Sequence, residues 1–169
     1  MEKDTFVTLL KEIRPELVSN LYSRKTMADG MFPILEGAHT SDTTRCLDNS
    51  TLPVVITFDG WTTKGFARQF VSIIVSWVEL QDTGFEVRRR LIDFKHPGHS
   101  VTSGVVQAQY ILDAARSVGI SETSFRERCV FVVADNAEDT TVAAHTLGVR
   151  KWGCLCHMIN LAFTEFQVS

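Results

Sequence analysis

The chain has 169 residues and a mass of 18.9 kDa, with 44% hydrophobic and 22% charged residues, a balance that is typical of one globular domain and excludes a disordered or fibrous protein. The net charge of −3 gives no overall attraction to a polyanion, so a nucleic-acid surface would have to be local. Apolar stretches fall short of the roughly 20 residues of a membrane span, and the N-terminus lacks a signal-peptide pattern, so we expect an intracellular protein with no membrane partner.

Residues 1–50 are predicted to form a helical extension and a linker. Apolar residues recur at helical spacing over Thr5–Tyr22, and a second helix is predicted over about Thr26–Leu35. The following stretch, Glu36–Ser50, is rich in Ser, Thr and Asp and is predicted to be a loop or linker, with room for a short helix around Asp42–Leu47.

Three strands are predicted next. The apolar run Pro53–Phe58 indicates a buried strand that ends in a turn at Asp59-Gly60. Further strands are predicted over Phe70–Leu80 and Phe85–Phe94, and the link Asp82-Thr83-Gly84 between them is a hairpin signal.

The rest of the chain is predicted to alternate between helix and strand. In order, the elements are a helix over Val101–Val118, a strand over Cys129–Ala134 buried on both faces, a helix over Ala137–Leu147, a short strand around Trp152 and a last helix from about His157. Adjacent strands followed by βα units indicate an α/β domain over residues 51–169, with a mixed sheet flanked by helices. We expect Trp77 and Trp152 in its core.

Two aspartates follow apolar strands: Asp59 after the first and Asp135 after the strand Cys129–Ala134. Ligands bind outside the carboxyl ends of strands in open α/β sheets, so both side chains would converge if these strands are neighbours. Paired carboxylates suit a divalent cation, which can promote phosphoryl transfer. The alternative is that each aspartate only caps the turn that follows it.

The segment Cys154-Leu155-Cys156-His157 precedes the last helix. As a zinc site it offers Cys154, Cys156 and His157, but structural zinc usually takes four ligands, so we expect no structural zinc. The alternative is a cluster in which the cysteines pack as small hydrophobic residues. All four cysteines, including Cys46 and Cys129, are expected to be reduced.

Three motifs in this order resemble the hAT superfamily of DNA transposases and the host zinc-finger proteins derived from them. They are Asp59-Gly60-Trp61-Thr62, Ala134-Asp135-Asn136-Ala137, and Cys154-x-x-His157 followed by Asn160-Leu161. The resemblance extends from Ser23-Arg24-Lys25-Thr26 to the last helix and so covers most of the chain.

This resemblance implies an RNase H-like fold and a DDE-type mechanism that depends on Mg²⁺ or Mn²⁺. Asp59 and Asp135 would be the first two catalytic acids and metal ligands. Matching positions expected to line the site or touch DNA are Trp61, Thr62, Asn136, Cys154 and His157. The implied partners are DNA and further copies of the protein, joined through regions absent from this chain, and the implied compartment is the nucleus.

The family pattern also includes a helical insertion, a catalytic Glu after it and a dimerisation region, none of which is recognisable here. We therefore expect the chain alone not to cut DNA. One alternative is a domesticated, non-catalytic module that binds DNA or protein. Another is an RNase H-like nuclease, which would need Asp113 to face the site. The basic run Arg88-Arg89-Arg90 either contacts phosphates or, on an edge strand, prevents aggregation.

Overall fold

The computed structural model describes residues 24–50, 52–62, 69–82, 84–97 and 103–168. The chain divides into two compact units, residues 1–39 and residues 40–169. The helix predicted over Thr5–Tyr22 lies outside the described residues.

The described part of the first unit is helical. It contains α3 (Arg24–Thr26), the π-helical turn η1 (Met27–Met31) and the beginning of α4 (Phe32–Asn49), which continues into the second unit. A helix beginning near residue 26 is therefore confirmed. The loop predicted over Glu36–Ser50 is wrong, because α4 runs through it, and the short helix allowed around Asp42–Leu47 is part of α4.

Tertiary packing explains why this polar stretch is helical. Leu47 is only 1% exposed and belongs to the core of the second unit, and Thr43 is also buried. Thr44 satisfies its hydroxyl inside the helix, where Oγ1 donates to the carbonyl oxygen of Thr40 at 3.0 Å. Local propensity disfavours a helix here, whereas the packing of Leu47 and Thr43 in the core favours it.

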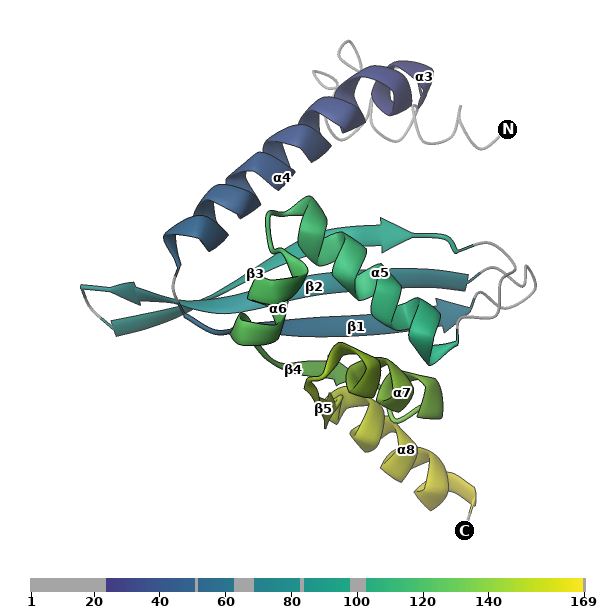
Figure 1. Cartoon of the computed structure of the whole chain (residues 1–169). Helices are drawn as coiled ribbons and strands as arrows, with labels where there is room; N and C mark the ends of the chain where they lie inside the picture. Colours follow the sequence, from purple (N-terminus) through teal and green to yellow (C-terminus); the bar gives the residue numbers. More distant parts are fainter. Residues whose placement is uncertain (1–23, 51, 63–68, 83, 98–102, 169) are drawn as a thin grey trace. The chain divides into compact units, whose positions relative to one another are not determined.

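The second unit is built on a five-stranded mixed sheet with the order β3-β2-β1-β4-β5 (Figure 1). Strands β1, β2 and β3 are antiparallel, and β4 and β5 run parallel to β1. Their bounds are β1 Val54–Thr62, β2 Gln69–Gln81, β3 Gly84–Lys95, β4 Cys129–Ala134 and β5 Arg150–Gly153. The predicted α/β class, the hairpin and all five strands are confirmed in position.

The register between β1 and β4 contains one irregularity. Val54 pairs with Cys129, but Val55 pairs with Phe131, so β4 has one residue more than β1 at this point. Beyond the irregularity the pairing is regular and reaches Thr57 and Val133.

Three helices cover one face of the sheet, which we call the covered face (Figure 1). They are α5 (Gly104–Ser117), α6 (Glu122–Arg128) and α7 (Glu138–Leu147). Helices α5 and α7 approach so closely that a Cβ on Gly104 would lie 2.4 Å from the carbonyl oxygen of Asp139. The sequence predicted α5 and α7, including the stop at Gly148, which has a left-handed φ of 72°. It missed α6.

The core lies between these helices and the sheet. Buried side chains alternate along the central strands, as a sheet with one covered face requires. The buried strand residues include Val54, Ile56, Phe58, Val71, Ile73, Val75, Trp77, Val132 and Ala134. The core position predicted for Trp77 is confirmed, since it is 2% exposed.

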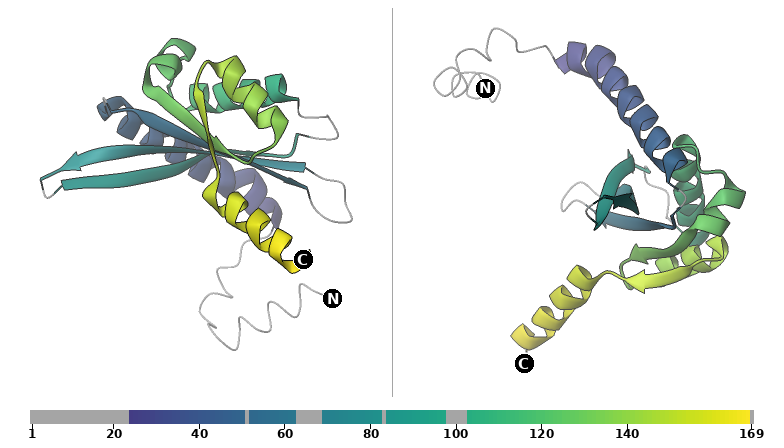
Figure 2. Two further views of the ribbon diagram at one scale, coloured as in Figure 1. Left: turned by 90° about the horizontal axis from the view of Figure 1, so that it is seen from below. Right: turned by 90° about the vertical axis from the view of Figure 1, so that its left-hand side faces the viewer.

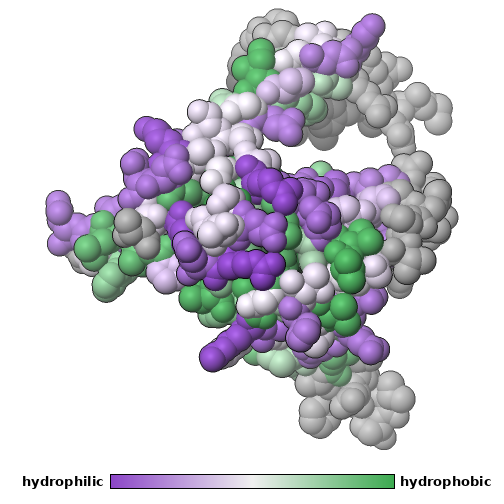
Figure 3. Space-filling view, in the orientation of Figure 1, coloured by the Kyte–Doolittle hydropathy of each residue, from purple (hydrophilic) through white to green (hydrophobic). Residues whose placement is uncertain are grey.

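The opposite side of the sheet, which we call the open face, has no helix packed along it among the described residues. Helix α8 (Leu155–Val168) begins on this side and extends away from the sheet (Figure 2). Two predictions are therefore wrong: β4 is not buried on both faces, and Trp152 is 63% exposed because β5 is an edge strand. On the helical side, seen in Figure 3, hydrophilic residues predominate.

No described helix combines the length and the apolar character that crossing a membrane requires.

Candidate functional site

The two aspartates lie on neighbouring strands. Because β1 and β4 are parallel and Thr57 pairs with Val133, continuing the register places Asp59 level with Asp135. Neighbouring strands lie roughly 4.8 Å apart. The prediction that Asp59 follows the end of its strand is wrong. Asp59 lies inside β1, since the pairing with β2 continues to Thr62.

Both aspartates line one open cavity of about 490 Å³ on the open face. Asp59 is exposed and Asp135 is half-buried. The wall is formed by residues of β1, β2 and β4, by Asp135 and Cys154, and by the beginning of α8. It consists of Thr57, Phe58, Asp59, Gly60, Ser72, Ile74, Val133, Asp135, Cys154, Cys156, His157 and Asn160.

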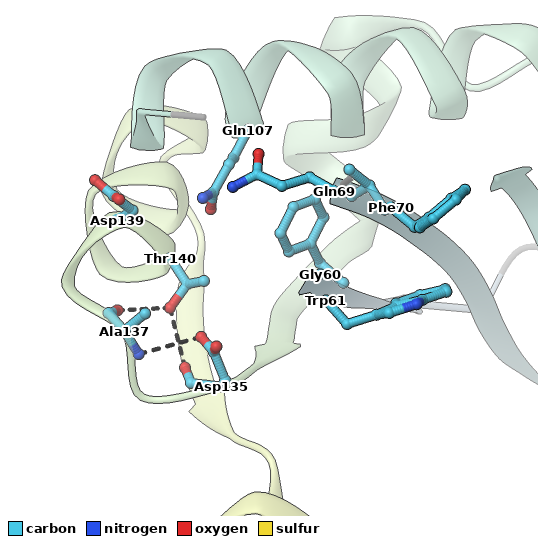
Figure 4. A pocket seen from close by; sticks show the side chains of 11 residues that line it. Gly60, Trp61, Gln69, Phe70, Gln107, Asp135, Ala137, Asp139 and Thr140 are labelled. Atoms are coloured by element: carbon cyan, nitrogen blue, oxygen red, sulfur yellow. Dashed lines mark hydrogen bonds between the residues drawn. The ribbon is translucent and has the colours of Figure 1, made fainter. Parts of the chain in front are cut away.

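Asp135 also holds the turn that leads into α7. Its Oδ1 accepts a hydrogen bond from the backbone N–H of Ala137 at 3.1 Å (Figure 4). Thr140 Oγ1 closes the same turn by donating to the carbonyl oxygens of Asp135 at 3.0 Å and Ala137 at 2.7 Å. One oxygen of Asp135 thus caps the turn that follows.

The segment Cys154–His157 reaches the same cavity from the junction of β5 and α8. The backbone N–H of Cys154 donates to the carbonyl oxygen of Ala134 at 2.7 Å, which ties the segment to the residue before Asp135. Cys154 is half-buried and Cys156 is exposed, so Cys156 does not pack as a buried hydrophobic residue. Within the described ranges no three His, Cys, Asp or Glu side chains are grouped to hold a metal ion.

The remaining predicted site residues have different surroundings. Asn136 is exposed and lies outside the lining of the cavity, and its Oδ1 would be 3.0 Å from a Cβ on Gly153. Thr62 ends β1, and its side chain lies outside the described residues. Trp61 is 41% exposed and lies two positions after Asp59, on the same face of β1.

Trp61 belongs to a group of rings that sequence reasoning missed. It stacks on Phe70 with ring centroids 5.8 Å apart, and Phe94 lies 5.6 Å from Trp61 and 5.8 Å from Phe70. His96 lies 5.3 Å from Phe70, and its Nδ1 is 2.6 Å from the carbonyl oxygen of Gln69. The alternation of residues along each strand shows which face each ring occupies. Only the register between the strands shows that the rings are neighbours.

A second, smaller cavity of about 130 Å³ lies at the same end of the sheet, between the covered face and α5 and α7. Figure 4 shows the amides of Gln69 and Gln107 pointing toward each other across it. The oxygen Oε1 of Gln69 is buried and has no hydrogen-bond partner among the described residues. Asp135 lines this cavity too, so it stands between the two.

Two further predictions concern charged residues away from the site. Strand β3 is an edge strand, and Arg88 is engaged there by Glu79 and Glu86, each at 2.9 Å. Asp113 on α5 accepts from Arg116 at 2.7 Å and lines neither cavity. It therefore does not supply the acid that the RNase H-like nuclease alternative needs.

No protein-family model matches this chain, and no curated protein matches its sequence.

Proposed function

We propose that this chain carries part of a metal-dependent site for phosphodiester chemistry on DNA, of the DDE type found in hAT-like transposases, on an RNase H-like sheet. The observation that supports it is the position of Asp59 and Asp135 on neighbouring parallel strands, facing one cavity. In this proposal the complete protein works in the nucleus as an oligomer and contributes a further acid from outside the chain.

The donor set fits Mg²⁺ or Mn²⁺. These hard cations bind through one or two carboxylates and complete their coordination with water and substrate phosphates. Asp59 and Asp135 would hold the ion, and the hydroxyls of Thr57 and Ser72 add oxygen atoms to the same wall. When bound, such an ion supplies Lewis-acid polarisation of the phosphate.

The chain's own residues position the substrate and shape the cavity. The turn that Asp135 caps fixes the direction of this carboxylate, because Oδ1 is anchored to Ala137 N–H. The cavity is open rather than enclosed, which suits an extended nucleic-acid strand. His157, which lines the same cavity, can donate a hydrogen bond to a phosphate oxygen.

A second candidate function is a non-catalytic module that keeps the fold and binds DNA or protein. The hydrogen bond from Ala137 N–H to Asp135 favours it, since a carboxylate with a structural role would be retained without any metal. The two candidates differ in whether Asp59 and Asp135 bind a cation together.

The test is a Mn²⁺ titration by isothermal calorimetry, with Asp59→Asn, Asp135→Asn and the control Asp113→Asn. We expect Mn²⁺ to bind the wild type. Its affinity should fall at least tenfold in each of the two site variants and should be unchanged in Asp113→Asn. An Asn at position 135 keeps an oxygen that can cap the turn, so folding should persist. Equal affinity of all four proteins would contradict the catalytic proposal and favour the non-catalytic module.

A further inference from the structure

We propose that Trp61, Phe70 and Phe94, which we call the ring cluster, form a stacking surface for an unpaired nucleobase. The inference rests on the proposed function, because the base would belong to the nucleic-acid strand whose phosphate faces Asp59. It adds the class of substrate to that function: a strand that is single-stranded or opened beside the site.

The register of the sheet places the ring cluster next to Asp59 on the open face. Asp59 pairs with Ser72, and Ser72 pairs with Phe94, so these three form one row across the sheet. Trp61 pairs with Phe70 in the adjacent row, two residues and roughly 7 Å further along β1. Paired residues point to the same face, so the rings and the carboxylate share one surface.

The rings are oriented as a platform. The planes of Trp61 and Phe70 are inclined by 24°, and those of Phe70 and Phe94 by 20°, which are stacked rather than edge-to-face arrangements. Trp61 is 41% and Phe94 54% exposed, so the platform presents aromatic surface to the outside instead of filling the core.

The surroundings favour a nucleobase over an apolar protein segment. The ring cluster is bordered by polar groups on the side of the site, namely Asp59, Ser72, the Gln69 carbonyl and His96, and by Ile74 and Leu91 in the next row of β2 and β3. Aromatic platforms bind bases of any sequence by stacking, whereas a protein interface buries a continuous apolar centre. Such an apolar patch exists at the other end of the hairpin, where Leu80 and Phe85 are 73% and 77% exposed.

The experiment measures fluorescence anisotropy of a labelled single strand of about 12 nucleotides with the whole chain at low salt and with Mg²⁺. A second ligand of equal length has abasic sites in place of the bases, so it offers the same phosphates without stacking. The variants are Trp61→Ala, Phe94→Ala and the conservative Trp61→Phe. Phe85→Ala is the matched control, since it removes an exposed ring from the same strand and face as Phe94.

We expect Trp61→Ala and Phe94→Ala each to raise the Kd about tenfold for the normal strand and to leave the abasic strand unaffected. Trp61→Phe and Phe85→Ala should bind like the wild type. Equal binding of the normal and abasic strands by the wild type would overturn the inference. So would a loss of self-association, rather than of strand binding, in the ring variants, because the surface would then contact a second copy.

The two proposals can fail separately. Ring-dependent binding together with no Mn²⁺ binding at Asp59 and Asp135 would support the stacking surface and overturn the metal-dependent function. Intact Mn²⁺ binding with an unchanged Kd in Trp61→Ala would do the reverse.

Discussion

The two faces of the sheet differ in what their side chains do. On the covered face, Ile73 and its neighbours are fully buried under α5, α6 and α7, and their burial stabilises the fold. On the open face, the positions between them carry Asp59, Trp61 and Ser72, which are exposed or half-buried and contribute little to the core. Strand residues alternate between the two faces. Along the same strand, one residue therefore stabilises the core and the next belongs to the side that carries the candidate site.

The strongest test of this separation compares two adjacent isoleucines of β2. Ile73 is 0% exposed on the covered face, and Ile74 lies on the open face and lines the cavity. We expect Ile73→Ala to lower the free energy of unfolding by about 2–5 kcal/mol, because it leaves a cavity in the core. Ile74→Ala should cost about 1 kcal/mol or less. Urea denaturation measures both, and equal losses would show that the open face is also part of the core.

The second test concerns how closely the helices pack on the covered face. In Gly104→Ala the new methyl group would overlap the carbonyl oxygen of Asp139 and the side chain of Val142, 2.4 and 2.5 Å away. We expect a loss of about 1–3 kcal/mol in the free energy of unfolding, since α5 and α7 must move apart. Gly37→Ala is the control: outside its own helix backbone, no atom of the described residues lies within 4 Å of the added Cβ, and the helix should be unchanged or slightly more stable. A stable Gly104→Ala protein would indicate that α5 and α7 can shift freely.

A third test separates the two aspartates. Asp135→Ala removes the acceptor for Ala137 N–H and should lower the free energy of unfolding by about 1 kcal/mol, whereas Asp135→Asn should restore most of it. Asp59→Ala should change stability by less than about 0.5 kcal/mol, because this side chain is exposed on the open face. Thermal melts of the three variants give the comparison. A large loss in Asp59→Ala would mean that its carboxylate has a structural partner.

The smallest expected effect is the loss of stability when the pH is lowered. The hydrogen bond from Arg88 holds the pKa of Glu79 below its usual value of 4.5, and Trp77 Nε1 adds a second bond at 3.2 Å. The folded protein therefore binds this proton less readily than the unfolded chain, so the stabilisation is present above about pH 4.5 and is lost as the pH falls below it. Melting temperatures of the wild type should fall more between neutral pH and about pH 3 than those of Glu79→Gln. Parallel pH profiles would contradict this role for the pair.

The sequence predicted the elements whose patterns are local. Apolar runs located β1, β2 and β4, the alternation of apolar and basic residues located β3, and stop residues such as Gly148 located helix ends. It missed α6, which is too short for a periodic pattern and depends on the Ser121 cap and on burial of Phe125. It also ended β1 too early, because the pairing of Trp61 with Phe70 outweighs the turn signal of Asp59-Gly60.

The site was partly predictable for the same reason. That Asp59 and Asp135 would meet followed from two strands being neighbours, and the structure places these strands side by side. The ring cluster was not predictable, since Phe70 and Phe94 are separated from Trp61 in sequence and only the antiparallel register brings them together. The exposure of Trp152 was missed because composition does not reveal that β5 is an edge strand.

The extra residue of β4 near its start has an effect at the opposite end of the strand. If Val130 paired with Val55 instead of being the extra residue, every later residue of β4 would shift by one relative to β1, and Asp59 would stand beside Ala134. Asp135 would then point to the face opposite Asp59. The burial pattern of β4 agrees with this irregularity. Cys129, Val132 and Ala134 are buried, so the spacing between buried residues is three at the irregularity and two after it. The irregularity that leaves Val130 unpaired, five positions before Asp135, thus places the two acids on the same face of the sheet.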